Sequence, residues 1–316
     1  MRVPRPSPLA YRRITIVAAV LLAVIIVSGA AVRLTNSGLG CPVGVSCPKS
    51  QLQAHGPSSE HATIEHLNRL FTGLVSVAVI LAVLGSLVRV PRRRDLVWLS
   101  VGLVAGVLAQ AVLGQLTVAF DLAPQFVMAH FLVSILLLTD ALVLVRRAGQ
   151  PDGPAHAVVS RRTVLLGRAL VALATVVLFT GTVVTGTGPH SGGSKSDKVA
   201  RLDYRLVDVA RVHSGFVLVL LAGVLAMLWL VRRDRAPRAV QQRVGVLLVL
   251  VVAQGAIGYI QYFNDIPAFL VGVHVAGATA VWAATMVLSL GMFERGVAVG
   301  REPEPSEAPG PLLTTA

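Results

Sequence analysis

Apolar residues gather in long runs along this chain, and each run is broken by only a few polar positions. A helix needs roughly 20 such residues to cross about 30 Å of hydrocarbon. Backbone groups in lipid must be bonded within the segment, so runs of this length predict membrane-spanning helices. Short alternating strands do not appear. Eight spans are expected, at 14–34, 64–88, 96–119, 126–145, 163–185, 210–231, 244–263 and 267–291.

Composition agrees with this pattern, because 54% of the 316 residues are hydrophobic and only 14% are charged. A soluble domain of this size carries far more polar surface, so the sequence predicts an all-α integral membrane protein. The first span is longer than the apolar core of a signal peptide, and no small-residue cleavage site follows it. We therefore expect it to stay in the protein as a transmembrane helix.

The net charge of +13 lies beside the spans and does not indicate nucleic-acid binding. Arginines cluster at the N-terminus and in the loops after the second, fourth and sixth spans. Positive loops face the cytoplasm, so both termini are expected there, in a multi-pass protein of the plasma membrane. The loop between the fifth and sixth spans is an exception, because it is expected outside and is also positive. The more numerous cationic loops on the other side decide the orientation. The cations of the exceptional loop are Lys195, Lys198, Arg201 and Arg205.

Two stretches of the chain repeat each other at a constant offset of 144 residues. The repeated positions are Gln110, Gly114, Asp121 and His130, followed by Gln254, Gly258, Asp265 and His274. Gly29 also aligns with Gly181 at the ends of the first and fifth spans, and Asn68 aligns with His213. Each unit is four helices. An even number restores orientation, so the copies are parallel and related by a pseudo-two-fold axis along the membrane normal.

The repeat predicts two four-helix bundles side by side. We expect an N-terminal half at 1–145, a cytoplasmic linker at 146–162 and a C-terminal half at 163–292. The tail at 293–316 is rich in proline and glutamate and is expected to be disordered.

Four histidines fall near one depth, within the first turns of helices that descend from the outer face: His66, His130, His213 and His274. Ionisable groups in a membrane are costly and usually functional, although interhelical hydrogen bonding is the simpler alternative. Imidazoles on facing helices can ligate haem iron from both sides. Zinc is disfavoured because no cysteine lies at this depth. The remaining histidines fall in loops and are expected to be solvated surface residues: His55, His61, His156 and His190.

The first half departs from this symmetry. His130 matches His274, but Asn68 stands where the second half has His213, and His66 lies about 200° away around the helix. Either the helix is shifted and His66 ligates, or His130 is the one strong protein ligand. We favour the second reading.

Further polar residues stand at the outer ends of the helices. Glu65 can pair with Arg69 one turn later, or accept a proton beside a reacting porphyrin edge. Arg69 and Arg211 can pair with haem propionates or extend toward the interface. Cys41 and Cys47 lie in the first outer loop, where a disulfide is the first expectation. A structural bridge and a redox-active pair look alike in sequence.

With these residues placed, the chain resembles the heme A synthase family over about residues 14–292. The matching text runs from Gly29 to Pro42, then Glu65 to Arg69, Gln110 to His130, His213, and Gln254 to His274. The resemblance implies eight helices in two halves. It also implies an oxidoreductase that oxidises the C8 methyl group of heme O to the formyl group of heme A, by successive hydroxylations with oxygen from water. Heme A formed in this way serves the assembly of aa3-type terminal oxidases.

The resemblance also implies roles for single residues. His213 and His274 would hold a heme b cofactor that relays electrons, and His130 would bind the substrate heme. Glu65 would act in catalysis, and Cys41 and Cys47 would form a disulfide. Many members have a histidine where this chain has Asn68, so the iron of the substrate heme is left with five-coordinate binding or with help from His66.

The resemblance implies heme O as substrate and heme O synthase as partner, besides membrane lipid and an electron acceptor that the sequence does not identify. No nucleic acid is expected, and a homo-oligomer is compatible with this reading. The alternative is a two-haem electron carrier of the cytochrome b type. That class uses four good axial histidines at two depths, whereas the candidates here share one depth. A transporter with parallel repeats would place its polar sites at the midplane.

Overall fold

The computed structural model describes residues 5–35, 56–191 and 200–296, with backbone alone at 56–62, 64 and 65. The described part contains eight helices that are long and apolar enough to cross a membrane. The all-α membrane class is therefore confirmed. The helices are α1 (Pro8–Leu34), α3 (Gly56–Val88), α4 (Arg94–Ala119), α5 (Pro124–Ala148), α6 (Arg161–Thr187), α7 (Leu206–Arg233), α8 (Arg238–Phe263) and α9 (Ala268–Leu290).

Most helices extend beyond the spans expected from the apolar runs, chiefly at their arginine-rich ends. Two of these ends are capped by serine. Ser7 accepts a hydrogen bond from the amide of Ala10 at 3.2 Å, and Ser160 accepts one from the amide of Thr163 at 3.3 Å. Such caps satisfy amides that have no partner within the helix. Arginine is also a good helix former, so the helix continues through turns that a hydropathy pattern leaves out.

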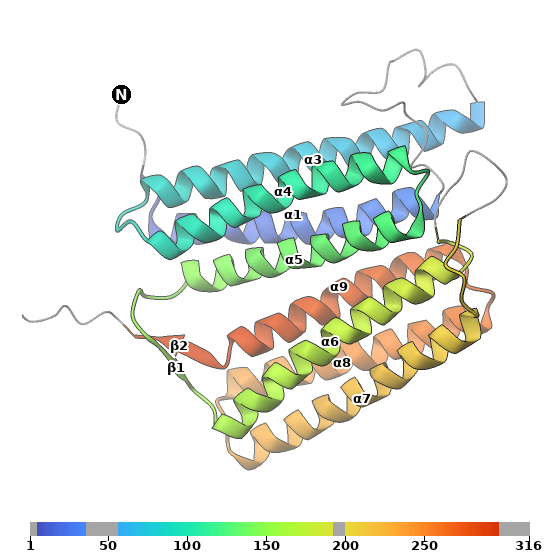
Figure 1. Cartoon of the computed structure of the whole chain (residues 1–316). Coiled ribbons are helices and arrows are strands. Elements are labelled where there is room, and N and C mark those ends of the chain that lie inside the picture. Colours follow the sequence, from blue (N-terminus) through green and yellow to red (C-terminus); the bar gives the residue numbers. More distant parts are fainter. Residues whose placement is uncertain (1–4, 36–55, 192–199, 297–316) are drawn as a thin grey trace, which may run out of the picture.

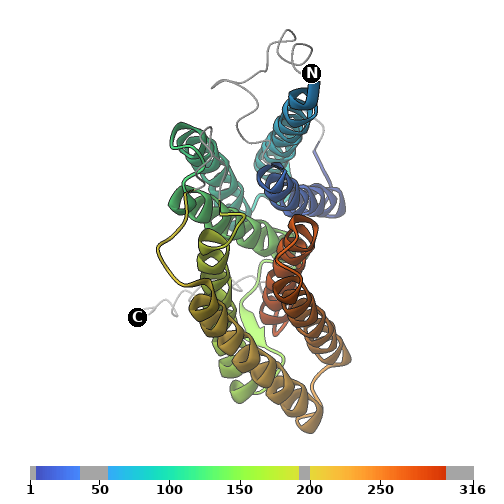
Figure 2. The same ribbon diagram turned by 90° about the vertical axis from the view of Figure 1, so that its right-hand side faces the viewer.

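The helices divide into two groups along the chain, as Figure 1 and Figure 2 show. In the first group α1 and α4 each pack against both α3 and α5. In the second group α6 and α8 each pack against both α7 and α9. Helices α3 and α5 therefore face each other across the first group, and α7 and α9 face each other across the second. The pseudo-two-fold relation between the groups stays a prediction.

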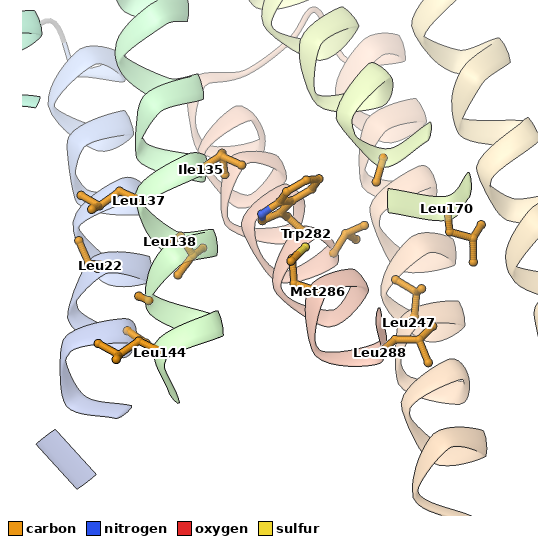
Figure 3. Packing of buried hydrophobic residues seen from close by; sticks show 14 of the residues in the cluster. Leu22, Ile135, Leu137, Leu138, Leu144, Leu170, Leu247, Trp282, Met286 and Leu288 are labelled. Carbon is orange, nitrogen blue, oxygen red and sulfur yellow. The ribbon is translucent and has the colours of Figure 1, made fainter. Parts of the chain in front are cut away.

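The two groups meet where α9 packs against α1 and α5, and where α5 packs against α6. Figure 3 shows Leu22 of α1 beside Leu137 of α5, with Trp282 between α5 and α9. These side chains belong to one buried cluster, which runs on through Met286 to Leu247 of α8. These side chains hold the helices together by van der Waals packing, because the hydrophobic effect does not drive helix association within lipid.

A short antiparallel sheet joins the linker to the segment after the last helix. Strand β1 (Ala155–Ala157) pairs with β2 (Phe293–Arg295), with His156 opposite Glu294. The tail expected at 293–316 therefore begins with an ordered strand, which is a correction of its predicted start. Residues 293–295 form a strand because they pair with residues 155–157, which are distant in sequence. The composition of residues 293–295 alone does not predict this pairing.

Helices α5, α7 and α9 all begin at the right-hand end of Figure 1, which we call the histidine end because their first two turns carry His130, His213 and His274. The opposite end is called the arginine end. There Arg93 is 3% exposed and pairs with Asp95 at 2.6 Å, and Arg147 pairs with the same carboxylate at 2.6 Å. Two arginines thus share one carboxylate at the arginine end.

The turns that precede α5 and α9 have the same geometry. Asp121 and Leu122 have φ of 49° and 57°, and Asp265 and Ile266 have φ of 57° and 56°. These left-handed conformations are rare outside glycine. In both turns the second residue donates its amide five residues back, Leu122 to Thr117 and Ile266 to Gln261, at 2.8 Å. The repeated sequence therefore builds the same tight turn twice.

Candidate functional site

The repeated glutamines make the same contact in each half. Nε2 of Gln110 on α4 donates to the carbonyl oxygen of His130 on α5 at 3.0 Å. Nε2 of Gln254 on α8 donates to the carbonyl oxygen of His274 on α9 at 2.6 Å. Each glutamine thus fixes the helix turn that bears a histidine. The offset found in the sequence corresponds to a repeated interaction in space.

The repeated glycines lie against the two imidazole rings. A Cβ added at Gly258 would lie 3.1 Å from Cε1 of His274, closer than ordinary van der Waals contact. A Cβ added at Gly114 would lie 3.7 Å from Cε1 of His130. Both rings therefore rest on the backbone of the neighbouring helix, and the second half holds its ring more tightly.

His213 on α7 is oriented through its Nδ1 atom. Oγ1 of Thr180 on α6 lies 3.1 Å from this nitrogen. The same hydroxyl donates its hydrogen to the carbonyl of Val176 at 2.9 Å. Since a hydroxyl has one hydrogen, Nδ1 of His213 is the donor in the contact with Thr180 when that hydrogen goes to the carbonyl. The neutral ring then has its lone pair on Nε2, in the tautomer that suits metal ligation.

His213 and His274 come from helices that face each other across the second group. The ring of His213 also rests on α6, where a Cβ at Gly181 would lie 3.1 Å from its Cε1. The pair is therefore arranged as two donors on opposite walls of one helix bundle, which is how bundles hold cofactors between side chains.

The first half has a hydroxyl residue, Ser28, in the position of Thr180, but it has no imidazole in the position of His213. Oγ of Ser28 on α1 donates to Oδ1 of Asn68 on α3 at 2.9 Å. Ser28 aligns with Thr180, and Asn68 aligns with His213. Gly29 faces open space, whereas the aligned glycine in the second half faces a ring. Asn68 therefore stands in the position of His213 and fills less of it.

Several buried nitrogens lack a hydrogen-bond partner within the described part of the chain. They include Nδ1 of His66, His130 and His274. Buried polar atoms normally have partners. The described residues contain no cluster of three or more histidine, cysteine or acidic side chains that could hold a metal ion. A porphyrin brings its own nitrogen ligands to iron and needs only one or two from protein, so this donor set fits haem better than a bare metal.

The remaining expected residues are placed as follows. Cys41 and Cys47 lie outside the described residues, and the side chain of Glu65 lies outside the described side chains. Arg69 is half-buried on α3. Arg211 is 78% exposed and lies 3.9 Å from Asp208. The structure places His213 and His274 on helices that face each other across the second group, and their joint ligation of one iron stays a prediction, as does the choice between His66 and Asn68.

One histidine expected at the solvated surface is partly buried. Nε2 of His190 lies 2.9 Å from the carbonyl oxygen of Ile266, in the turn before α9. The sequence expectation for His190 was therefore wrong. The left-handed turn at Ile266 presents its carbonyl to the loop after α6, and a loop assignment alone does not foresee this.

Three residues that position or extend the site were not singled out from the sequence: Ser28, Thr180 and Arg33. The alignment of Gly29 with Gly181 offered a signal for the first two, because hydroxyl residues precede both glycines. Arg33 had a different signal, since it lies within an otherwise apolar helix.

Comparison with known proteins agrees with the geometry. A family profile described as COX15-CtaA, cytochrome oxidase assembly protein, matches residues 12–189. Heme A synthase of Listeria monocytogenes serotype 4a (strain HCC23) is 23% identical over 285 residues, covering 85% of this chain and 91% of the relative. Heme A synthase of Shouchella clausii (strain KSM-K16) is 25% identical over 256 residues, covering 78% and 85%. The profile matches more than half of the chain, and the protein belongs to the heme A synthase family.

Proposed function

We propose that this protein oxidises the C8 methyl group of heme O to the formyl group of heme A. The observation that carries the proposal is the contrast between two equivalent positions. The second half has His213 and His274 on facing helices, whereas the first half has Asn68 and His130 on the equivalent helices. Two imidazoles suit a resident electron-transfer haem, and one imidazole suits a bound substrate that must enter and leave. The named relatives are heme A synthases.

The C-terminal half, residues 163–292, is the cofactor half in this proposal. His213 and His274 would hold heme b, which when bound takes up and passes on single electrons. Thr180 would hold His213 through Nδ1 and leave Nε2 to ligate the iron. Gly181 and Gly258 let the rings of His213 and His274 approach α6 and α8 closely. These residues orient the ligands and add no chemistry of their own.

The N-terminal half, residues 1–145, is the substrate half. His130 would bind the iron of heme O and so fix the porphyrin relative to α5. Ser28 donates to the amide oxygen of Asn68, which keeps a weakly ligating group opposite His130. Substrate bound through one strong ligand can exchange. His66 stays an alternative second ligand, and Arg69 stands one helix turn from Glu65 on the same helix.

Glu65 is the proposed proton acceptor at the methyl group. Each hydroxylation takes oxygen from water and releases electrons and protons, so a carboxylate at the mouth of the pocket is suited to take up a proton. Electrons would pass through the second half to an acceptor outside the protein. Cys41 and Cys47 would form a disulfide in the preceding loop.

The proposed orientation puts the histidine end at the outer face of the plasma membrane. The arginine end would then face the cytoplasm, as positive loops do. Residues 146–162 would be the linker between the halves. Heme O synthase would supply the substrate from within the same membrane, and the product would serve assembly of the terminal oxidase.

The cofactor assignment is tested by haem extraction from purified variants. His213→Ala and His274→Ala are expected to lose heme b, because each removes one of two axial ligands. His156→Ala is the matched control, since this histidine lies exposed on β1. Full heme b occupancy in both axial variants would contradict the assignment.

The reaction is tested by co-expression with a heme O synthase, followed by analysis of the extracted haems. The wild-type protein is expected to yield heme A. Glu65→Gln is expected to keep heme b while heme O or a partly oxidised haem accumulates. A two-haem electron carrier would bind haem without converting it, so absence of heme A from the wild-type cells would favour that alternative.

A further inference from the structure

Arg33 lies in the last turn of α1, on the same side of the helix as its buried residues. Leu22 and Ile26 are 3% and 7% exposed, and Arg33 follows Ile26 by seven residues, which returns it to the same helix face. Its side chain is half-buried, and its Nε is buried without a hydrogen-bond partner in the described part of the chain. One nitrogen of the charged guanidinium is thus buried without a partner among the described residues.

The protein offers this guanidinium little compensating charge. No ion pair of Arg33 occurs among the described residues. The sequence contains no aspartate or glutamate between Leu34 and Ser59, and the next two carboxylates, Glu60 and Glu65 on α3, lie outside the described side chains. A buried charge without a partner is strongly unfavourable. Arg33 therefore has the properties of a group that is completed by an anion from outside the chain.

The direction of Arg33 follows from its neighbours on α1. Ser28 contacts α3 through Asn68, and Leu34 packs within 3.4 Å of a Cβ placed at Gly272 on α9. Arg33 lies on the third side of the helix, with Leu22, which Figure 3 shows beside Leu137 of α5. Arg33 is thus turned toward the helix that carries His130.

The helix face one turn below Arg33 is not packed against by other described residues at Gly29. Gly29 faces open space, and it precedes Arg33 by four residues, so the two share a helix face. The second half has no equivalent arginine, because the alignment of Gly29 with Gly181 puts Thr185 at this position. Thr185 donates to the carbonyl of Gly181 at 3.0 Å. The buried charge therefore belongs to the substrate half alone.

We propose that Arg33 binds a propionate carboxylate of the substrate haem. The inference rests on the proposed function, since it assumes that a porphyrin occupies the first half. An arginine fork pairs with a carboxylate through two parallel hydrogen bonds, which fixes orientation as well as adding affinity. Together with His130, this contact would set which edge of the porphyrin faces Glu65, and thus which methyl group is oxidised.

The test compares two ligands that differ only in their carboxylates. Purified full-length protein, made without heme O synthase and carrying heme b, is titrated with hemin or with hemin dimethyl ester, and the Soret absorbance is followed. The wild-type protein is expected to prefer hemin about tenfold or more, as a charge-assisted contact implies. Arg33→Gln is expected to lose this preference, with weaker binding of hemin and unchanged binding of the ester. Arg33→Lys is expected to keep part of the preference.

Arg205→Gln is the matched control, because Arg205 is 84% exposed and is expected to leave hemin binding unchanged. The proposal is overturned if Arg33→Gln binds hemin as the wild type does, or if it loses hemin and ester alike. Retained heme b reports that the variant is folded. If Arg33→Gln does not fold, Arg33→Lys decides: a reduced preference for hemin supports the proposal, and an undiminished preference overturns it. Wild-type protein that takes up no hemin at all would refute the proposed function instead.

Discussion

The indole Nε1 of Trp282 on α9 donates a 2.9 Å hydrogen bond to Oγ1 of Thr139 on α5. Trp282 is 6% exposed and packs in the cluster where the two helix groups meet. The two helices that it joins carry His274 and His130. The bond therefore connects the two proposed haem sites through the helices on which they are built.

Replacing Trp282 tests how much this junction contributes to stability. Trp282→Phe keeps most of the packing and removes the hydrogen bond, so a loss of about 1 kcal/mol is expected. Trp282→Ala also leaves a cavity and is expected to cost about 3–5 kcal/mol. Thermal unfolding in detergent, monitored by heme b release, measures both. Equal melting temperatures for the two variants would argue against the packing role.

Thr180 is expected to control the ligand strength of His213. Thr180→Val removes the acceptor of the Nδ1 hydrogen while keeping the side-chain shape. Outer-shell partners of this kind typically contribute about 10- to 100-fold in metal affinity, so heme b is expected to dissociate at least tenfold more readily. Thr180→Ser is expected to restore retention. Unchanged retention and an unchanged heme b reduction potential in Thr180→Val would contradict this role.

Two glycines provide a matched pair of steric tests. In Gly258→Ala the new methyl group would lie 3.1 Å from His274, and the ring must move away. In Gly114→Ala the corresponding distance is 3.7 Å, which is ordinary contact. Gly258→Ala is therefore expected to lower heme b content, whereas Gly114→Ala is expected to leave His130 in position. Haem quantification per protein in both variants checks the contrast, and equal losses would refute it.

Asn68→His is expected to give the first half a second strong ligand. Ser28 would then stand to the new imidazole as Thr180 stands to His213, and Gly29 faces the open space that the larger ring requires. The substrate haem is expected to become low-spin and to exchange more slowly. Absorption and paramagnetic resonance spectra of the haem-loaded variant measure this. A high-spin spectrum identical to the wild type would show that the position does not reach the iron.

The helices and the repeat could be predicted because both depend on local pattern. Apolar length decides which segments span a membrane, and a rigid helix converts a constant offset into a repeated contact, as between Gln110 and His130 or Gln254 and His274. The ends of the helices were less predictable. Capping by Ser7 and Ser160 extends them into segments that hydropathy treats as loops.

Contacts that depend on tertiary placement were not predictable from pattern. His190 contacts a carbonyl of a turn 76 positions later in the chain. The composition of the loop that contains His190 does not predict this contact. Arg33 was not singled out in the sequence, and the helix face that it shares with Ile26 indicates its inward direction. Strand β2 needs β1 as its partner, so its three residues carry no strand signal alone.

The pairing of β1 with β2 also constrains how the protein is made. Because β1 precedes α6 and β2 follows α9, the ribbon closes around the whole second set of four helices. Its last strand leaves the ribosome only after every transmembrane segment has been synthesised. The second set of four helices is therefore closed at its arginine end only after all four of its helices have been synthesised.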